Sequence, residues 1–308
     1  MTATTPNDLV TLIDMIRYGA SRFNAHGLCF GHSYDNALDE ATQLVLHALH
    51  LPIDLAPTYG QARLLTEEKQ TILTLFERRI HARIPAAYLI GEAWFANLCF
   101  KCDQRALVPR SPIAELIENG FEPWLAGRHV ARALDLCTGS GCIALAMAHY
   151  QPQWQVTGLD ISPSALSLAE ENKARLRISN VEFIQSDLFA AAPKQAFQLI
   201  VTNPPYVTHA QVDDLPEEYR HEPELGLRAG TDGLDIVLRI LRDAPDYLDP
   251  EGILICEVGE ADGALMRLLP ELELDWIAFQ VGYMGVFAIE ASRLRSHQAR
   301  ITTLLKTR

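Results

Sequence analysis

The 308-residue sequence contains no run of about twenty consecutive apolar residues, the length that a helix needs to cross a bilayer. Its first ten residues, MTATTPNDLV, lack the basic start and the apolar stretch of a secretory signal peptide. Six cysteines are scattered through apolar stretches and form no disulfide framework, which is typical of a reducing compartment. These absences predict a protein that works in the cytoplasm.

Clustered metal ligands are also missing. Cys99 and Cys102 form a single C-x-x-C, and no second pair follows at the spacing of a zinc site, which needs about four ligands. We therefore expect two reduced thiols in a strand and no metal.

Positive charge is in short supply, because 26 lysines and arginines face 39 aspartates and glutamates, for a net charge of −13. A protein that works mainly on nucleic acid backbones is usually basic, since lysine and arginine supply the phosphate contacts. An acidic protein suits a basic protein partner, because opposite charges steer the two together. The charge therefore disfavours naked nucleic acid as the main partner.

Hydrophobic periodicity divides the chain into three parts. Residues 7–84 show the i, i+3, i+4 spacing of amphipathic helices, and residues 86–110 hold the aromatic and β-favouring residues of a hairpin. After Pro112, short apolar runs alternate with helical lengths, which indicates an α/β fold. We predict an N-terminal helical domain over residues 1–84, a β-hairpin linker over 85–110 and an α/β domain over 111–308.

The α/β part is expected to contain seven strands. They are predicted at residues 131–136, 155–159, 181–184, 197–202, 252–258, 275–281 and 285–290, with helices at 142–150, 163–177, 233–247 and 261–269. The lengths between the first four strands favour parallel pairing. The last two strands are joined too tightly for a helix, so we expect an antiparallel hairpin at the sheet edge.

A glycine-rich turn follows the first of these strands, in ALDLCTGSGCIALAMA. Gly139 and Gly141 allow a tight turn and the close approach of a ligand to backbone N–H groups at a helix start. Three acids end successive strands: Asp135 can face an ammonium group, Asp160 can accept both hydroxyls of a ribose, and Asp187 can accept from an adenine amino group.

The same turn fits a second ligand, because Gly139-Ser140-Gly141 with Ala144 matches the dinucleotide pattern G-x-G-x-x-A. A nicotinamide enzyme is therefore an alternative. Asp135, however, would repel a pyrophosphate. The acids favour S-adenosyl-L-methionine, an aminoacyl-adenosine without phosphate.

The fourth strand ends abruptly in LIVTNPPYVTH, at Asn203-Pro204-Pro205-Tyr206. Ligands of α/β sheets bind at the carboxyl ends of the strands, so this motif is expected to meet the glycine turn across one crevice. A planar amide nitrogen is a poor nucleophile because its lone pair is delocalised. The Asn203 side-chain oxygen and the Pro204 carbonyl can each accept one of its N–H groups, and Tyr206 can stack on it and stabilise a nearby cation. The alternative, an ordinary turn, is disfavoured by the motif's place in the sheet.

These motifs resemble the class I S-adenosylmethionine-dependent methyltransferases and, more narrowly, the protein-glutamine N5-methyltransferases. The resemblance covers essentially the whole chain, including VPRSPIAELI, DLCTGSG, NPPY and HEPELGLRAGTDGL. One branch methylates the GGQ glutamine of peptide release factors, and the other a glutamine of large-subunit ribosomal protein L-three. The release-factor branch has Arg-Pro-Asp-Thr-Glu after the hairpin, where this chain has Arg110-Ser111-Pro112-Ile113-Ala114-Glu115, so it resembles the ribosomal branch.

The resemblance implies a seven-stranded mixed, Rossmann-like sheet in a methyltransferase domain over residues 111–308. It also implies that the small helical domain over residues 1–84 recognises the substrate and that residues 85–110 form a hairpin linker. It implies methyl transfer from S-adenosyl-L-methionine, which becomes S-adenosyl-L-homocysteine, to a glutamine of L-three, free or in an assembling large subunit. The implied cofactor-binding residues are Asp135, Cys137, Thr138, Gly139, Ser140, Gly141, Asp160, Ile161, Asp187, Leu188 and Asn203. The implied catalytic residues are Asn203, Pro204, Pro205 and Tyr206, with Arg110 and Glu222 as substrate-wall residues.

Two positions depart from the family pattern, which often has a glycine at Cys137 and an aromatic residue at Leu188. The first departure is expected to alter backbone freedom, and the second to weaken an adenine contact.

Two charged segments have open interpretations. Residues 213–224 hold six acids against one arginine, either as an acidic lip for a basic substrate or as a solvated loop, and Glu222 alone could be a solvated acid. Residues 291–308 have five basic residues and no acid, which fits an incidental contact with ribosomal RNA or a capped, exposed final helix.

Other functions also stay open. A methyltransferase acting on adenine or cytosine amino groups would use the same four residues, but it would need a basic groove and a pocket for a flipped base. Methylation of release factors is a second alternative, and a non-catalytic cofactor-binding assembly protein is a third.

Overall fold

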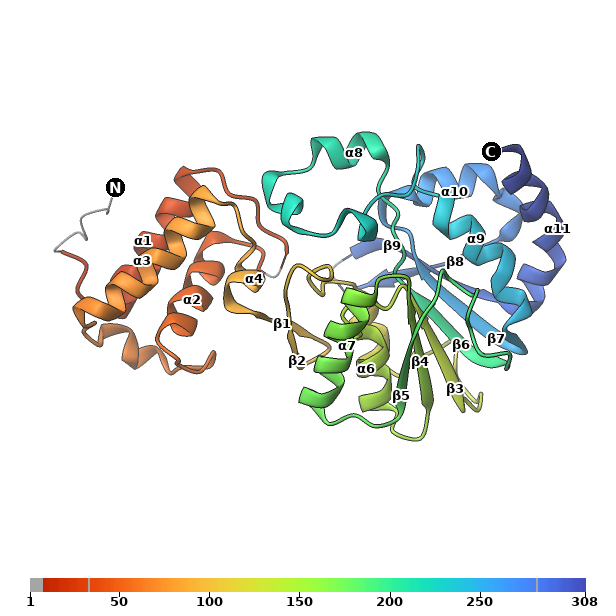
Figure 1. Cartoon of the computed structure of the whole chain (residues 1–308), viewed down its shortest axis with the longest axis horizontal. Helices are drawn as coiled ribbons and strands as arrows, with labels where there is room; N and C mark the ends of the chain where they lie inside the picture. Colours follow the sequence, from red (N-terminus) through yellow and green to blue (C-terminus); the bar gives the residue numbers. More distant parts are fainter. Residues whose placement is uncertain (1–7, 33, 281) are drawn as a thin grey trace. The chain divides into compact units, whose positions relative to one another are not determined.

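The computed structural model describes residues 8–32, 34–280 and 282–308, which form two compact units (Figure 1). The first unit contains the described residues up to Ala93, with Cys102–Gln104 and Pro216–His221. The second unit contains Trp94–Lys101, Arg105–Leu215 and Glu222–Arg308. A short piece of chain that follows the NPPY motif in sequence therefore belongs to the helical first unit.

The first unit is built from helices, as the periodicity of residues 7–84 predicts. Their bounds are α1 (Leu12–Ala25), α2 (Ala37–Ala48), α3 (Thr66–His81) and α4 (Ala86–Ile90), with a 3-10 turn η1 (Pro57–Gln61). Helix α1 starts with a capping box, in which Thr11 accepts from the Asp14 backbone and Asp14 accepts from the Thr11 backbone. The rings of Phe23 and Phe76 meet edge to face, 5.2 Å apart, in the core between the helices.

The hairpin is shorter than predicted. It consists of β1 (Glu92–Phe95) and β2 (Leu98–Lys101), and the turn residues Ala96 and Asn97 have φ values of 46° and 57°. Residues 86–90 form α4 and are not part of the hairpin, which corrects the prediction for this stretch. The run AAYLI is too short for its periodicity to separate a helix from a buried strand.

The second unit contains a seven-stranded sheet in the order β5-β4-β3-β6-β7-β9-β8. The strands are β3 (Arg132–Leu136), β4 (Gln155–Asp160), β5 (Val181–Gln185), β6 (Phe197–Thr202), β7 (Leu248–Glu257), β8 (Asp275–Phe279) and β9 (Gly282–Glu290). The first five pair in parallel, and β9 is antiparallel to both β7 and β8. The predicted mixed sheet with an antiparallel hairpin at its edge is confirmed.

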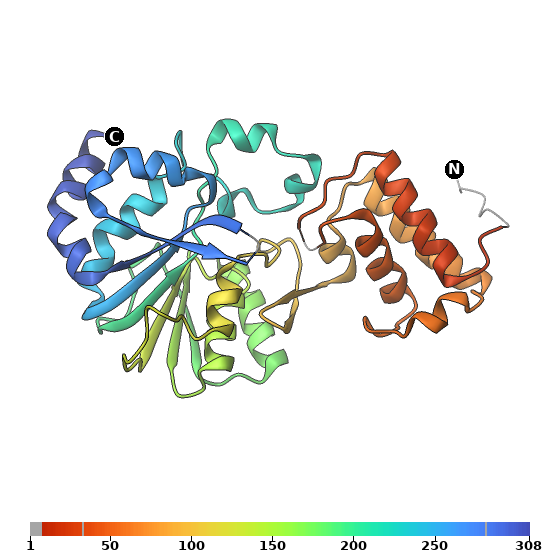
Figure 2. The same ribbon diagram turned by 180° about the vertical axis from the view of Figure 1, so that it is seen from behind.

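Helices cover both faces of this sheet (Figures 1 and 2). The alternation of side chains along a strand explains why both faces are apolar. The helices of the second unit are α5 (Ile113–Glu118), α6 (Cys142–Tyr150), α7 (Pro163–Leu176), α8 (His209–Asp214), α9 (Asp235–Asp243), α10 (Asp262–Leu268) and α11 (Ala291–Thr307). In β3, Ala133 packs with α5 and α6, whereas its neighbour Leu134 packs with α9 and α11.

Short 3-10 turns complete the chain: η2 (Glu217–His221), η3 (Glu224–Gly226), η4 (Ala244–Asp246), η5 (Gly259–Ala261) and η6 (Pro270–Leu272). Across the described ranges, no helix combines the length and the apolar character that a membrane crossing requires.

The final helix is present, so the helical interpretation of residues 291–308 is confirmed. Its expected cap and exposure are not, because α11 has no side-chain N-cap and buries Leu294 and Ile301 in the core. Four of its five basic side chains have partners inside the unit, among them Arg293, which donates to the Glu273 carbonyl. Arg295 donates to the carbonyls of Pro245 and Leu248, Arg300 lies 3.4 Å from Glu271, and Arg308 pairs with Asp232. These pairings leave little free positive charge for an RNA contact.

Candidate active site

The glycine turn and the NPPY motif leave the sheet side by side. Leu136 at the end of β3 lies opposite Thr202 at the end of β6, and the Thr202 hydroxyl donates to the Leu136 carbonyl at 2.9 Å. The next residues in each chain segment are Cys137 and Asn203, which begin the two loops. The structure therefore brings together the two motifs that the sequence analysis singled out.

The backbone of the glycine turn is sharply bent. Cys137, Gly139 and Gly141 all have left-handed φ values, of 59°, 55° and 79°. A Cβ on Gly141 would lie 2.8 Å from the Phe183 ring, so only glycine fits at the start of α6. Cys137 has a left-handed backbone conformation, which costs a residue with a Cβ more than it costs glycine. Cysteine at a position where the family often has glycine therefore restricts the backbone of this turn.

Asp135 is fully buried under this turn. Its Oδ2 accepts from the Thr138 hydroxyl at 2.5 Å and from the Ala144 N–H at 3.1 Å. Its Oδ1 has no hydrogen-bond partner among the described residues, and burial raises the pKa of the carboxyl to about 7. A buried acceptor without a donor fits a cationic ammonium group, which the methionine end of S-adenosyl-L-methionine carries.

Asp160 ties the glycine turn to the next helix. Its two oxygens accept from the backbone N–H groups of Gly139 and Ser162, each at 2.8 Å. Burial raises the pKa of this carboxyl. Because each carboxylate oxygen has two lone pairs, both can still accept from a hydroxyl, such as those of a ribose. The neighbouring Ile161 is half exposed and presents an apolar surface beside it.

Asp187 has a partner that the sequence did not reveal. Its Oδ1 lies 2.8 Å from a guanidinium nitrogen of Arg239 on α9, and about half of its side chain is exposed. The adjacent Leu188 is buried and has a left-handed φ of 48°. Arg239 lies 52 positions after Asp187 in the sequence, so no local pattern could have indicated this pair.

The NPPY motif is fixed at both ends. Before it, β6 pairs with β3 and β7. After it, Val207 donates to the Leu227 carbonyl at 2.9 Å and accepts from the Ala229 N–H at 2.8 Å. Between these anchors Pro204 is buried and Asn203 is half buried. The Asn203 side chain makes no hydrogen bond to any described residue, so its amide is available to a ligand.

Tyr206 is held by Glu257, a residue that the sequence analysis missed. The Tyr206 hydroxyl donates to Glu257 Oε1 at 2.8 Å, and the Ser111 hydroxyl donates to Oε2 at 2.6 Å. Glu257 is the last residue of β7. The reasoning that singled out acids at the ends of the other strands could have found it.

Arg110 and Glu222 form a partly buried ion pair. The two guanidinium nitrogens lie 2.5 and 2.7 Å from the Glu222 oxygens, and the Val108 N–H donates to the same carboxylate at 2.9 Å. Glu222 is buried, so the alternative of a solvated acid was wrong. The two residues bind each other, and the pair anchors the loop that follows NPPY.

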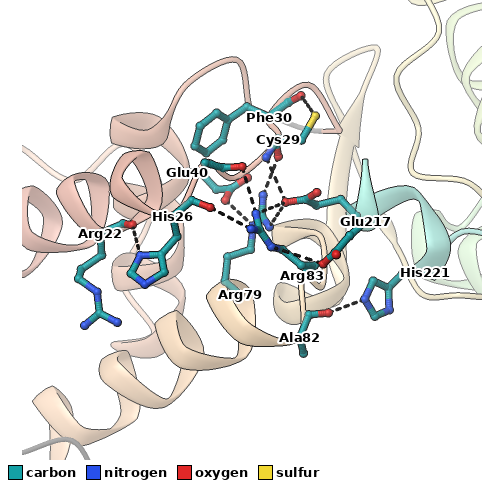
Figure 3. Close-up of polar contacts among 12 residues, drawn as sticks. Arg22, His26, Cys29, Phe30, Glu40, Arg79, Ala82, Arg83, Glu217 and His221 are labelled. Atoms are coloured by element: carbon teal, nitrogen blue, oxygen red, sulfur yellow. Dashed lines mark hydrogen bonds and ion pairs between the residues drawn. The ribbon is translucent and has the colours of Figure 1, made fainter. Parts of the chain in front are cut away.

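A second acid of that loop is buried in the first unit. Glu218 pairs with Arg79 at 2.9 Å, and Arg79 also pairs with Glu40 at 2.7 Å; Figure 3 shows Glu40, Arg79 and their surroundings. The Cys29 N–H donates to Glu218 at 3.0 Å, and the Cys29 carbonyl accepts from Arg79 at 2.7 Å. A wholly solvated segment over residues 213–224 is therefore excluded, and the alternative of an acidic lip loses Glu218 and Glu222, which are both buried.

Comparison with known proteins identifies close relatives. Residues 122–218 match the methyltransferase small domain family. The chain is 66% identical to the ribosomal protein uL3 glutamine methyltransferase of Xanthomonas campestris pv. campestris, with 100% of both chains covered. It is 65% identical to the enzyme of the same name from Xylella fastidiosa Temecula1, covering 100% of this chain and 99% of that one. The enzyme of that name from Bordetella pertussis is 47% identical over 272 residues, 88% of this chain and 91% of that one. The chain belongs to the ribosomal protein uL3 glutamine methyltransferase family.

Proposed function

We propose that this protein transfers the methyl group of S-adenosyl-L-methionine to the side-chain amide nitrogen of a glutamine in ribosomal protein uL3. Full-length identity of 66% to a relative with that activity in its name supports the substrate. The observation that carries the chemistry is the pairing of Leu136 with Thr202, because both loops begin at the next residue. Donor and acceptor sites are thereby adjacent.

The donor supplies an electrophilic methyl carbon on a sulfonium. Around it we assign Asp135 to the ammonium group, Asp160 to the ribose hydroxyls, and Asp187 with Leu188 to the adenine. Asp135 offers the best-defined contact, because its Oδ1 is buried and lacks a hydrogen-bond donor among the described residues. The turn from Cys137 to Gly141 completes the binding surface with its backbone.

The acceptor side consists of a rigid pair of oxygens. Asn203 Oδ1 and the Pro204 carbonyl each accept one N–H of the glutamine amide, which fixes the direction in which its nitrogen faces the methyl group. The proline ring fixes the φ dihedral of Pro204, which restricts the movement of the Pro204 carbonyl. Positioning of this kind can supply several kcal/mol of the rate enhancement. The methylated nitrogen becomes acidic and can release its proton late, so no general base is required.

Two alternative substrates are less well supported. A nucleic acid base would need a positive groove, whereas the net charge is −13 and basic residues of α11 are paired within the unit. Release factors are disfavoured by the family to which the chain belongs. The substrate state, free uL3 or an assembling large subunit, is part of the proposal, and either places the reaction in the cytoplasm.

The decisive experiment offers four substrates in parallel with labelled donor: free uL3, a precursor large subunit, a release factor and ribosomal RNA. Mass spectrometry then locates the methyl group. We expect N5-methylation of one glutamine in uL3 and no label in the release factor or the RNA. Label confined to the release factor or to RNA, or no transfer to either form of uL3, would overturn the proposal.

A further inference from the structure

The segment before α5 reaches the NPPY motif through a buried carboxylate. The Ser111 and Tyr206 hydroxyls donate to opposite oxygens of Glu257, at 2.6 and 2.8 Å. Glu257 is 4% exposed and Ser111 is 8% exposed, so both hydrogen bonds are shielded from water. Hydrogen bonds to a charged group are stronger than neutral ones and hold their partners more tightly.

Glu257 lies beside the start of the motif. Its neighbour Cys256 pairs with Thr202 in the register of β7 and β6, and Thr202 immediately precedes Asn203. On the other side, Ser111 Oγ accepts from the Ile113 N–H at 3.2 Å, which fixes Ser111 at the start of α5. The Glu257 carboxylate therefore links the end of β7 and the start of α5 to the Tyr206 ring.

Burial of this carboxylate is costly. Transfer of a charged group out of water is unfavourable even when it is hydrogen-bonded, and an apolar side chain of similar volume often stabilises a protein as well or better. Desolvation raises the pKa of Glu257, although the hydroxyls of Ser111 and Tyr206 and the charge of Arg110 oppose that rise. A buried acid at the end of β7 is therefore better explained by its hydrogen bond to Tyr206 than by a contribution to stability.

We propose that Glu257, supported by Ser111, is a positioning residue for methyl transfer, which holds the Tyr206 ring in the orientation that stacks on the substrate amide. This inference rests on the proposed function of the NPPY motif. Glu257 touches no reacting atom, so its effect passes through Tyr206. Losing the hydrogen bond lets the ring swing and lowers turnover without removing any contact to the donor.

The test compares purified wild-type protein with Glu257→Gln, Tyr206→Phe, the double variant and Ser111→Ala, using uL3 as substrate. We expect Glu257→Gln and Tyr206→Phe each to lower kcat by about tenfold or more, and Ser111→Ala by less. The KM for uL3 and the affinity for S-adenosyl-L-homocysteine are expected to stay within about twofold. Glu257→Gln replaces the charged acceptor of this hydrogen bond by a neutral amide, and Tyr206→Phe removes its donor. Because both single variants act on the same hydrogen bond, the double variant is expected to be no slower than the worse of the two.

A pH profile separates positioning from a merely structural role. The groups that face Glu257 are Ser111, Tyr206, Arg110 and Cys256. Protonation of Glu257 as the pH falls removes one of its acceptors, so wild-type kcat is expected to decline on the acid side. This decline is expected to be absent in Glu257→Gln, which cannot titrate.

Glu251→Gln is the matched control, since Glu251 lies on the same strand and is exposed; its kcat is expected to match the wild type. Wild-type kcat in Glu257→Gln, or losses that multiply in the double variant, would overturn the positioning role alone. If Glu257→Gln does not fold, the kcat values of Tyr206→Phe and Ser111→Ala decide instead. Both are expected to lie below the wild-type value, and wild-type kcat in both would overturn the positioning role of Glu257. Failure of the wild-type protein to methylate uL3 would instead contradict the proposed function.

Discussion

The Tyr206 ring lies so close to Gly259 that a Cβ on this glycine would stand 2.5 Å from the ring. Gly259 also has a left-handed φ of 47°, which side chains other than glycine rarely adopt. The position of the ring therefore depends on the absence of a side chain in the turn after β7, as well as on Glu257.

Gly259→Ala is predicted to displace the ring. We expect kcat for uL3 to fall by about tenfold or more and stability to fall by about 1–2 kcal/mol, the cost of the left-handed conformation. Gly263→Ala in α10 is the control, because the nearest atom to its Cβ is the end of the Arg267 side chain, 3.4 Å away. That variant is expected to keep its activity and gain about 0.5–1 kcal/mol. Equal kcat values for the two variants would show that methylation of uL3 does not depend on the position of the Tyr206 ring.

Asp135 is predicted to couple donor binding to pH. Its pKa is about 7 in the folded protein and about 4 in an unfolded chain. The folded state therefore holds an extra proton between these values, so the contribution of Asp135 to the free energy of unfolding is fully present below about pH 4 and is lost as the pH rises through about 7.

An ammonium group beside Asp135 favours the ionised carboxylate. Binding of S-adenosyl-L-homocysteine is therefore expected to release a proton near pH 7 and to tighten as the pH rises through that value. Calorimetry in two buffers of different ionisation enthalpy measures the proton release. Asp135→Asn is expected to bind more weakly and to lose the release, and a persistent release in this variant would contradict the assignment.

Arg79 is predicted to be essential for the stability of the first unit. Its guanidinium group is 1% exposed and pairs with two buried acids, Glu40 and Glu218. Arg79→Leu would leave Glu40 buried without a cation and Glu218 with only the more distant Arg83, 3.4 Å away, at an expected cost of about 3–5 kcal/mol.

Arg78→Leu is the control for this effect, since Arg78 is the exposed neighbour on the same helix α3. Leucine and arginine have similar helix propensities, so this change is expected to alter stability by less than about 0.5 kcal/mol. Chemical denaturation of the two variants measures the difference. Equal stability would mean that the buried cluster contributes nothing.

Much of the fold is readable from the sequence because it depends on local patterns. The apolar runs and helical spacings identify the strands of the second unit and most of its helices, although the short helices α5 and α8 were not predicted. The carboxyl-edge rule brings the glycine turn to NPPY. The start of β7 at Leu248 was missed, because Asp249-Pro250-Glu251-Gly252 has the composition of a turn and the strand is irregular there.

Side-chain pairs between distant segments are what local patterns cannot reveal. Glu218 and Glu222 sit in an acid-rich stretch whose composition predicts solvation. Their partners, Arg79 and Arg110, lie 139 and 112 positions away in sequence, so only the folded chain shows that both acids are buried. The same applies to Glu257, whose role depends on Ser111, 146 positions earlier.

Asn203 is predicted to act mainly by orienting the substrate amide, although the family resemblance also implies a contact between this residue and the donor. The most direct test measures uL3 methylation and S-adenosyl-L-homocysteine affinity for Asn203→Ala, with the exposed Asn24→Ala as control. We predict that Asn203→Ala lowers the methylation rate by about 100-fold or more, roughly 2.7 kcal/mol, while ligand affinity stays within about threefold. A methylation rate within twofold of the control would contradict the account.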